Sequence, residues 1–175
     1  MIRTVARVVG IAVLTVGVLA PAGAAPHKSF GSGSTPCNDG TVSWSPTTLW
    51  PPNHKMQTIT IGYTDNDNDG DMIGVMVGSI HDNQSSADGS NELNGSGQPT
   101  DKQGLDWSGS GNMGMSTDPG TATTTAQVRA ERSGRDKGGR VYTIAVTCSD
   151  MGGSNMEMQM QTVNITVTVP HDQGH

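Results

Sequence analysis

Apolar residues recur at every second position in several segments of the chain, and Gly, Asn, Asp and Pro separate these segments. Such alternation predicts β-strands with one buried face, and no segment has the 3.6-residue periodicity of an amphipathic helix. We expect strands near 56–64 and 72–81, a strand ending near Ala130, a strand through Tyr142–Cys148, and a last strand over 156–169. Antiparallel strands with one wet face indicate an all-β fold, here an antiparallel β-sandwich of about seven strands.

The last strand contains two apolar sets of opposite parity. Met156, Met158 and Met160 occupy one face, whereas the valines from Val163 onward occupy the other. Side chains alternate strictly along a strand, so a regular strand cannot bury both sets. If both sets are buried, one extra residue is needed between them, and we predict a β-bulge near 161–162.

The stretch 82–120 breaks the alternation and is rich in Gly, Ser and Asn. We expect one long loop here, held to the body of the domain at its middle by Trp107. Loops of this length are usually functional or mobile, and binding residues concentrate on loops that a rigid scaffold presents. The stretch is therefore the predicted recognition region.

The first residues predict export. Arg3 and Arg7 precede an apolar run, and the small residues of Ala22–Ala24 supply a cleavage site, as in a secretory signal peptide. The run is shorter than the about 20 residues that a membrane span needs. We therefore expect a signal peptide over 1–24, a flexible segment over 25–36 and one domain over 37–173, with no membrane span, in a protein that is secreted, extracellular or held in the cell envelope.

Charge and cysteine content narrow the partners. The formal net charge of −6 makes nucleic acid and anionic lipid poor partners. Cys37 and Cys148 are the two cysteines of the chain. In an oxidising compartment an even pair is usually bridged, so we predict a disulfide between them.

Several short motifs carry a resemblance to a known family. The stretches 45–56, 129–134, 139–144 and 169–173, together with the order of strand, Asp-Gly-Asn turn and last strand in 142–169, resemble bacterial secreted immunoglobulin-like domains related to the hyalin repeat (HYR). The resemblance implies an extracellular β-sandwich used for adhesion or protein contact. The chain departs from the pattern in its sparse cysteines and in the additional glycine at Gly152–Gly153.

The densest group of candidate ligands is the run 65–71, in which Asp65, Asp67, Asp69 and Asp71 alternate with Asn, Asn and Gly. This spacing resembles the first half of an EF-hand loop, but position twelve is Met76 instead of an acid, so a true EF-hand is excluded. Two interpretations stay open. The loop binds Ca²⁺ loosely, or it is a polar turn built from the ordinary turn residues.

These features predict a non-catalytic binding or adhesion-type module whose ligand is an extracellular protein or glycan of unknown identity. No Gly-x-Ser-x-Gly or His-Glu-x-x-His motif occurs, so we expect no enzyme and no catalytic residues. Two alternatives from other classes are a small carbohydrate-active or hydrolytic protein and a metal-handling envelope protein. The second would use thioethers of the Met156–Met160 segment, which suit soft metals, or the pair His54 and His171.

Overall fold

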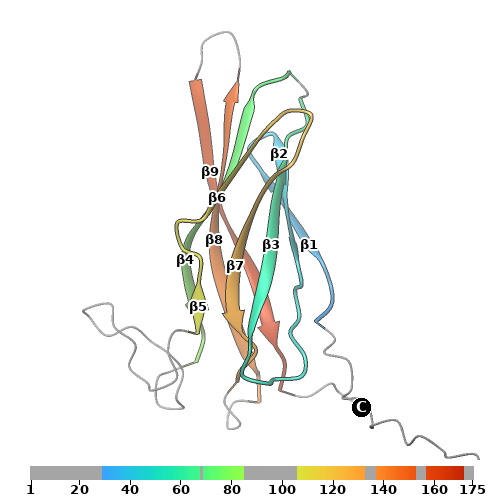
Figure 1. Cartoon of the computed structure of the whole chain (residues 1–175), viewed down its shortest axis with the longest axis vertical. Helices are drawn as coiled ribbons and strands as arrows, with labels where there is room; N and C mark the ends of the chain where they lie inside the picture. The colour runs from blue at the N-terminus through green and yellow to red at the C-terminus, as the bar shows by residue number, and fades with distance from the viewer. Residues whose placement is uncertain (1–28, 68, 85–105, 133–136, 153–156, 172–175) are drawn as a thin grey trace, which may run out of the picture.

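The chain forms an all-β sandwich of two antiparallel sheets (Figure 1). The computed structural model describes residues 29–67, 69–84, 106–132, 137–152 and 157–171. The five-stranded sheet has the order β1-β2-β3-β7-β5 and the four-stranded sheet the order β6-β4-β8-β9. The strands are β1 (Gly33–Cys37), β2 (Gly40–Ser45), β3 (Met56–Thr64), β4 (Met72–Asp82), β5 (Trp107–Ser108), β6 (Met113–Thr117), β7 (Ala122–Arg129), β8 (Arg140–Gly152) and β9 (Glu157–Val169).

The core lies between the sheets and uses the alternation that the sequence predicts. Ile59, Ile61 and Tyr63 point inward from β3. On the facing sheet, β8 buries every second residue from Arg140 to Asp150. The predicted strands are therefore confirmed, and their inward faces are those that we expected except in the last strand. Trp107 packs against the core, also as expected. In the described part of the chain, no helix is long and apolar enough to cross a membrane.

A disulfide joins the two sheets. Cys37 of β1 and Cys148 of β8 are bonded, with their Cα atoms 6.3 Å apart and a separation of 111 positions in the sequence. Both side chains are fully buried. The predicted bridge is confirmed, and it fastens the five-stranded sheet to the four-stranded one.

Three expectations differ from the structure. β9 pairs with β8 without interruption from Glu157 to Val169, so the predicted bulge at 161–162 is wrong. Met158 and Met160 are instead 55% and 59% exposed, since nothing forces apolar residues on the outer face of a strand into the core. The irregularity in the sheet lies in β4, between Val77 and Ile80.

The other differences concern the ends of predicted segments. The stretch 82–120 contains β5 and β6, so it is not one continuous loop, and 85–105 lie outside the described residues. β1 begins at Gly33, inside the stretch 25–36 that we expected to be flexible. It is held there by antiparallel pairing with β2 over its whole length.

Candidate metal centre

One end of the sandwich gathers aspartates from four segments, and we call it the acidic end. The β3–β4 loop and the β6–β7 loop both lie at this end (Figure 1). The Asp118 N–H donates to the Asp71 carbonyl at 2.9 Å, which ties these two loops together. The Asn66 side chain donates to the Asp39 carbonyl at 2.7 Å, which brings in the β1–β2 turn. The last inward position of β8, Asp150, completes the group.

Two of these aspartates stand where the apolar core ends. Asp65 follows Ile61 and Tyr63 on the inward face of β3, and Asp150 follows Cys148 on the inward face of β8. Their exposures are only 6% and 4%. The inward alternation of each chain segment thus continues for one more position, and that position is an aspartate. One carboxylate from each sheet therefore lies above the apolar core.

The carboxylates converge closely enough to share a cation. Oxygens of Asp65, Asp67 and Asp150 lie within 4.8 Å of one another, and so do oxygens of Asp67, Asp69 and Asp118. We call these groups the inner triad and the outer triad. Because Asp67 belongs to both, the acidic end offers two neighbouring positions bridged by one residue.

Several buried oxygens of this cluster have no hydrogen-bond partner among the described residues. Asp65 Oδ2, Asp150 Oδ1 and both carboxylate oxygens of Asp118 are buried in this state, and so is the Tyr63 hydroxyl. Asp65 Oδ1 accepts a hydrogen bond from the Asn66 N–H at 2.8 Å, so the oxygen without a partner is the second one, Oδ2. Buried polar atoms are almost always paired because desolvation without compensation costs about 1–3 kcal/mol or more for each. Carboxylate oxygens in this position are suited to bind a cation.

Mutual repulsion is visible in the proton affinities. Burial raises the pKa of Asp150 above its ordinary value, and the neighbouring charges of Asp65, Asp67, Asp69 and Asp71 raise it further. Burial also raises the pKa of the Tyr63 hydroxyl, with Asp65 and Asp150 adding to the shift. Burial and crowding of like charges therefore both disfavour the negative charge of Asp150.

Among the described residues, no lysine or arginine belongs to the acidic end. The lysines and arginines of the described residues all belong to segments at the opposite end, where β3 and β8 begin and β7 ends: they are Lys55, Arg129, Arg132, Lys137 and Arg140. In the described part, no Lys or Arg ion pair reaches an aspartate of the acidic end.

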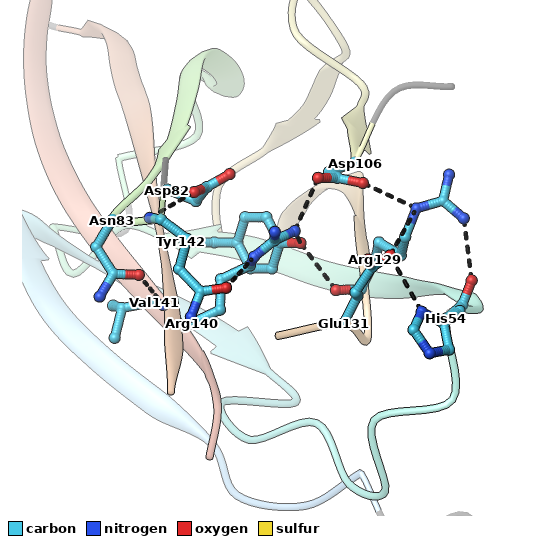
Figure 2. A network of polar contacts seen from close by, with 10 residues as sticks. His54, Asp82, Asn83, Asp106, Arg129, Glu131, Arg140, Val141 and Tyr142 are labelled. Carbon is cyan, nitrogen blue, oxygen red and sulfur yellow. Dashed lines mark hydrogen bonds and ion pairs between the residues drawn. The ribbon is translucent and has the colours of Figure 1, made fainter. Parts of the chain in front are cut away.

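At that opposite end a buried carboxylate is paired with arginines (Figure 2). Asp106 is completely buried and binds two arginines, with Oδ2 at 2.8 Å from Arg140 Nη1 and Oδ1 at 2.9 Å from Arg129 Nε. Arg140 also donates to the Tyr142 hydroxyl at 3.0 Å, and that hydroxyl donates to the Arg129 carbonyl at 2.8 Å. We call this arrangement the arginine network.

The arginine network has a clear structural task. Arg140 Nε donates to Gln84 Oε1 at 3.0 Å, while its Nη1 binds Asp106. Gln84 and Asp106 are the residues on either side of 85–105, so one guanidinium fixes both ends of that segment. At the edge of the network, His54 Nδ1 lies 3.3 Å from Glu131 Oε2, and the His54 side chain is 65% exposed.

The sequence analysis identified part of the acidic cluster. Asp65, Asp67 and Asp69 lie in the triads, whereas Asp71 belongs to neither, although it adjoins Asp150 beside Gly152. Asp118 and Asp150 were missed. Asp150 could have been found as the next inward position after Cys148, but nothing local marks Asp118. Metal binding by Asp65, Asp67, Asp69 and Asp71 stays a prediction.

No family model matches the chain, and no curated protein is significantly similar to it.

Proposed function

We propose that this protein is an exported, non-catalytic binding module whose acidic end binds Ca²⁺. The observation that carries the proposal is the pair of inward carboxylates, Asp65 and Asp150, which close the core from opposite sheets with buried oxygens that lack partners. A cation between them satisfies both and joins the sheets. The buried disulfide and the predicted signal peptide fit an oxidising extracytoplasmic compartment.

Calcium fits the donor set better than other common cations. The triads supply only carboxylate oxygens, from a loop, a second loop and a strand, and Ca²⁺ accepts six to eight oxygens in irregular geometry. Mg²⁺ requires a nearly ideal octahedron and keeps much of its water. Zn²⁺ prefers nitrogen and sulfur ligands in a tetrahedron. Extracellular modules bind Ca²⁺ with dissociation constants of about 10⁻⁴–10⁻³ M, and the two buried carboxylates of the inner triad favour the tighter part of this range.

The binding role rests on how the loops are held. An ion at the inner and outer triads fastens the β3–β4 loop, the β6–β7 loop and the end of β8 to one another. At the other end the arginine network provides a rigid base for the segment 85–105. The likeness to HYR-type domains favours adhesion or contact with an extracellular protein or glycan, and loops on a rigid sandwich are suited to it.

Calorimetric titration of the mature chain, stripped with EDTA and carrying no affinity tag, tests the calcium step. The wild-type chain should bind at least one Ca²⁺ per molecule, and Mg²⁺ at the same concentration should bind far more weakly. Asp150→Asn should abolish binding at the inner triad. The matched control is Asp39→Asn, which removes the same charge from the same end but lies outside both triads.

The variants also distinguish binding from folding. Asp150→Asn removes repulsion from the calcium-free site, so without calcium it should be at least as stable as the wild type. A wild-type chain that gives no heat with Ca²⁺ contradicts the proposal. So does equal calcium affinity in the Asp150→Asn and Asp39→Asn chains.

A further inference from the structure

The four-stranded sheet carries methionines on the face that points away from the core. Six of them are exposed by 42–62%. All of these except Met72 line a surface hollow, together with Met76. We call this surface the methionine face, and its members are Met72, Met76, Met113, Met115, Met151, Met158 and Met160. The described core contains no methionine. Methionine commonly fills irregular cores, so its confinement to the outer face is not a consequence of packing.

Strand register arranges the thioethers in rows across the sheet. Met72 of β4 lies opposite Met151 of β8, which lies opposite Met158 of β9. Four residues after Met72, and on the same face of β4, Met76 lies opposite Met113 of β6. Opposite side chains of antiparallel strands have Cβ atoms about 4.5–5.5 Å apart. Flexible thioether arms at that spacing can reach a common point above the sheet.

Small residues form a floor between these rows. Gly74 and Ser149 lie opposite each other on the two central strands, with Met115 on one side and Met160 on the other. A Cβ at position 74 would lie only 2.6 Å from Ser149 Oγ, so the floor stays low because residue 74 is glycine. The result is a hollow of about 260 Å³ with methionines around it.

We propose that this hollow binds a monovalent soft cation, Cu(I), through thioether sulfurs. Its lining contains no ionisable side chain, and apart from the methionines it consists of Gly74, Val75, Thr147 and Ser149. Neutral thioethers select Cu(I) and the similar ion Ag(I), whereas Ca²⁺ and Mg²⁺ require oxygen ligands. The disulfide removes both thiols from competition. This site goes beyond the calcium function and does not depend on it.

The lining also favours a cation over an apolar protein partner. Protein interfaces are enriched in Tyr, Trp, Phe and Arg as well as Met, but none of those other residues lines the hollow. Methionine alone, from four strands around a small floor, matches the needs of metal coordination more closely than those of a broad contact surface.

The test uses the mature chain without a polyhistidine tag, because such a tag binds copper. Under ascorbate, the chain should take one Cu(I) per molecule from a chromophoric Cu(I) chelator of moderate affinity. With methyl-¹³C-methionine labelling, redox-inert Ag(I) should shift the methyl signals of the methionine face. The signal of Met56, on β3 of the other sheet, should not move.

A triple variant separates thioether binding from apolar docking. Met115→Leu/Met151→Leu/Met160→Leu keeps the apolar character and similar volume, but should lower Cu(I) affinity at least about tenfold, a loss that even outer-shell changes cause at metal sites. Met56→Leu is the matched control and should bind as the wild type does. A wild-type chain that leaves all copper on the chelator, or a triple variant of unchanged affinity, overturns the proposal and leaves the face as a docking surface for a protein.

Discussion

The two ends of the sandwich bury charge in opposite ways. At one end, Asp106 is completely buried between Arg129 and Arg140, and the chain supplies both charges. At the other, Asp65, Asp118 and Asp150 are buried beside further aspartates, and their unpartnered oxygens have no Lys or Arg ion pair within the described residues. A buried charge needs an opposite charge nearby. The difference therefore teaches that the chain itself supplies the cations around Asp106, whereas at the acidic end we propose that Ca²⁺ supplies them.

The largest loss of stability should come from a variant that breaks the arginine network. Asp106→Asn keeps the shape of the side chain but leaves the buried Arg140 without its anion. Removal of one partner from a buried ion pair costs about 3–5 kcal/mol, so urea unfolding should show a loss of that order. A loss below about 1 kcal/mol is typical of an exposed ion pair. Such a result would contradict the view that the arginine network pairs buried charges.

The disulfide beneath the acidic end should matter nearly as much for stability. Replacement of both cysteines by serine removes a crosslink that closes 111 residues, and loss of a native disulfide typically costs about 2–5 kcal/mol. Because Cys148 precedes Asp150 by one inward position, the variant should also bind Ca²⁺ more weakly. Unfolding curves and calcium titrations of the same preparation measure both effects, and unchanged stability would contradict the first.

Calcium binding should change the free energy of unfolding less than these two variants do, and the change should depend on the acidic end alone. At about 5 mM Ca²⁺ and a dissociation constant of about 10⁻⁴–10⁻³ M, linkage predicts about 1–2 kcal/mol of stabilisation. The thermal midpoint of the wild type should rise by several degrees. The Asp106→Asn chain should show the same rise, since distant sites act additively. A rise that disappears with Asp106→Asn would show that the two ends are coupled.

The smallest effect is the pH dependence of the calcium-free chain. Burial and repulsion raise the folded pKa of Asp150 above its unfolded value of about 3.9. A raised pKa favours the folded state below the unfolded value, and this contribution is lost as the pH rises through the folded value. Unfolding free energies from pH 4 to 7 should therefore fall in the wild type relative to Asp150→Asn. A pH-independent difference would argue against a crowded site.

The alternation of Ile59–Tyr63 and Tyr142–Cys148 was enough to predict both core faces, because each residue there follows from its neighbours two positions away. The prediction failed for Met158 and Met160 because it assumed that apolar side chains must be buried. β9 presents them to solvent without any break in pairing.

Only part of the candidate site could be predicted from the sequence, because the rest depends on contacts between distant segments. The run 65–71 is visible as a local pattern, whereas Asp118 joins it only because the β6–β7 loop hydrogen-bonds to the β3–β4 loop. The pairing of Asp106 with Arg140 likewise joins residues 34 positions apart in the sequence. Neither contact has a local signature, and a single sequence does not show which distant segments will meet.

The most direct test of the account is a crystal structure of the mature chain grown with Ca²⁺, with an anomalous difference map calculated at a wavelength where calcium scatters. The account predicts a peak among the carboxylates of Asp65, Asp67 and Asp150, with oxygen ligands about 2.3–2.6 Å away. A map without a peak at the acidic end, at a calcium concentration above the measured dissociation constant, would contradict it.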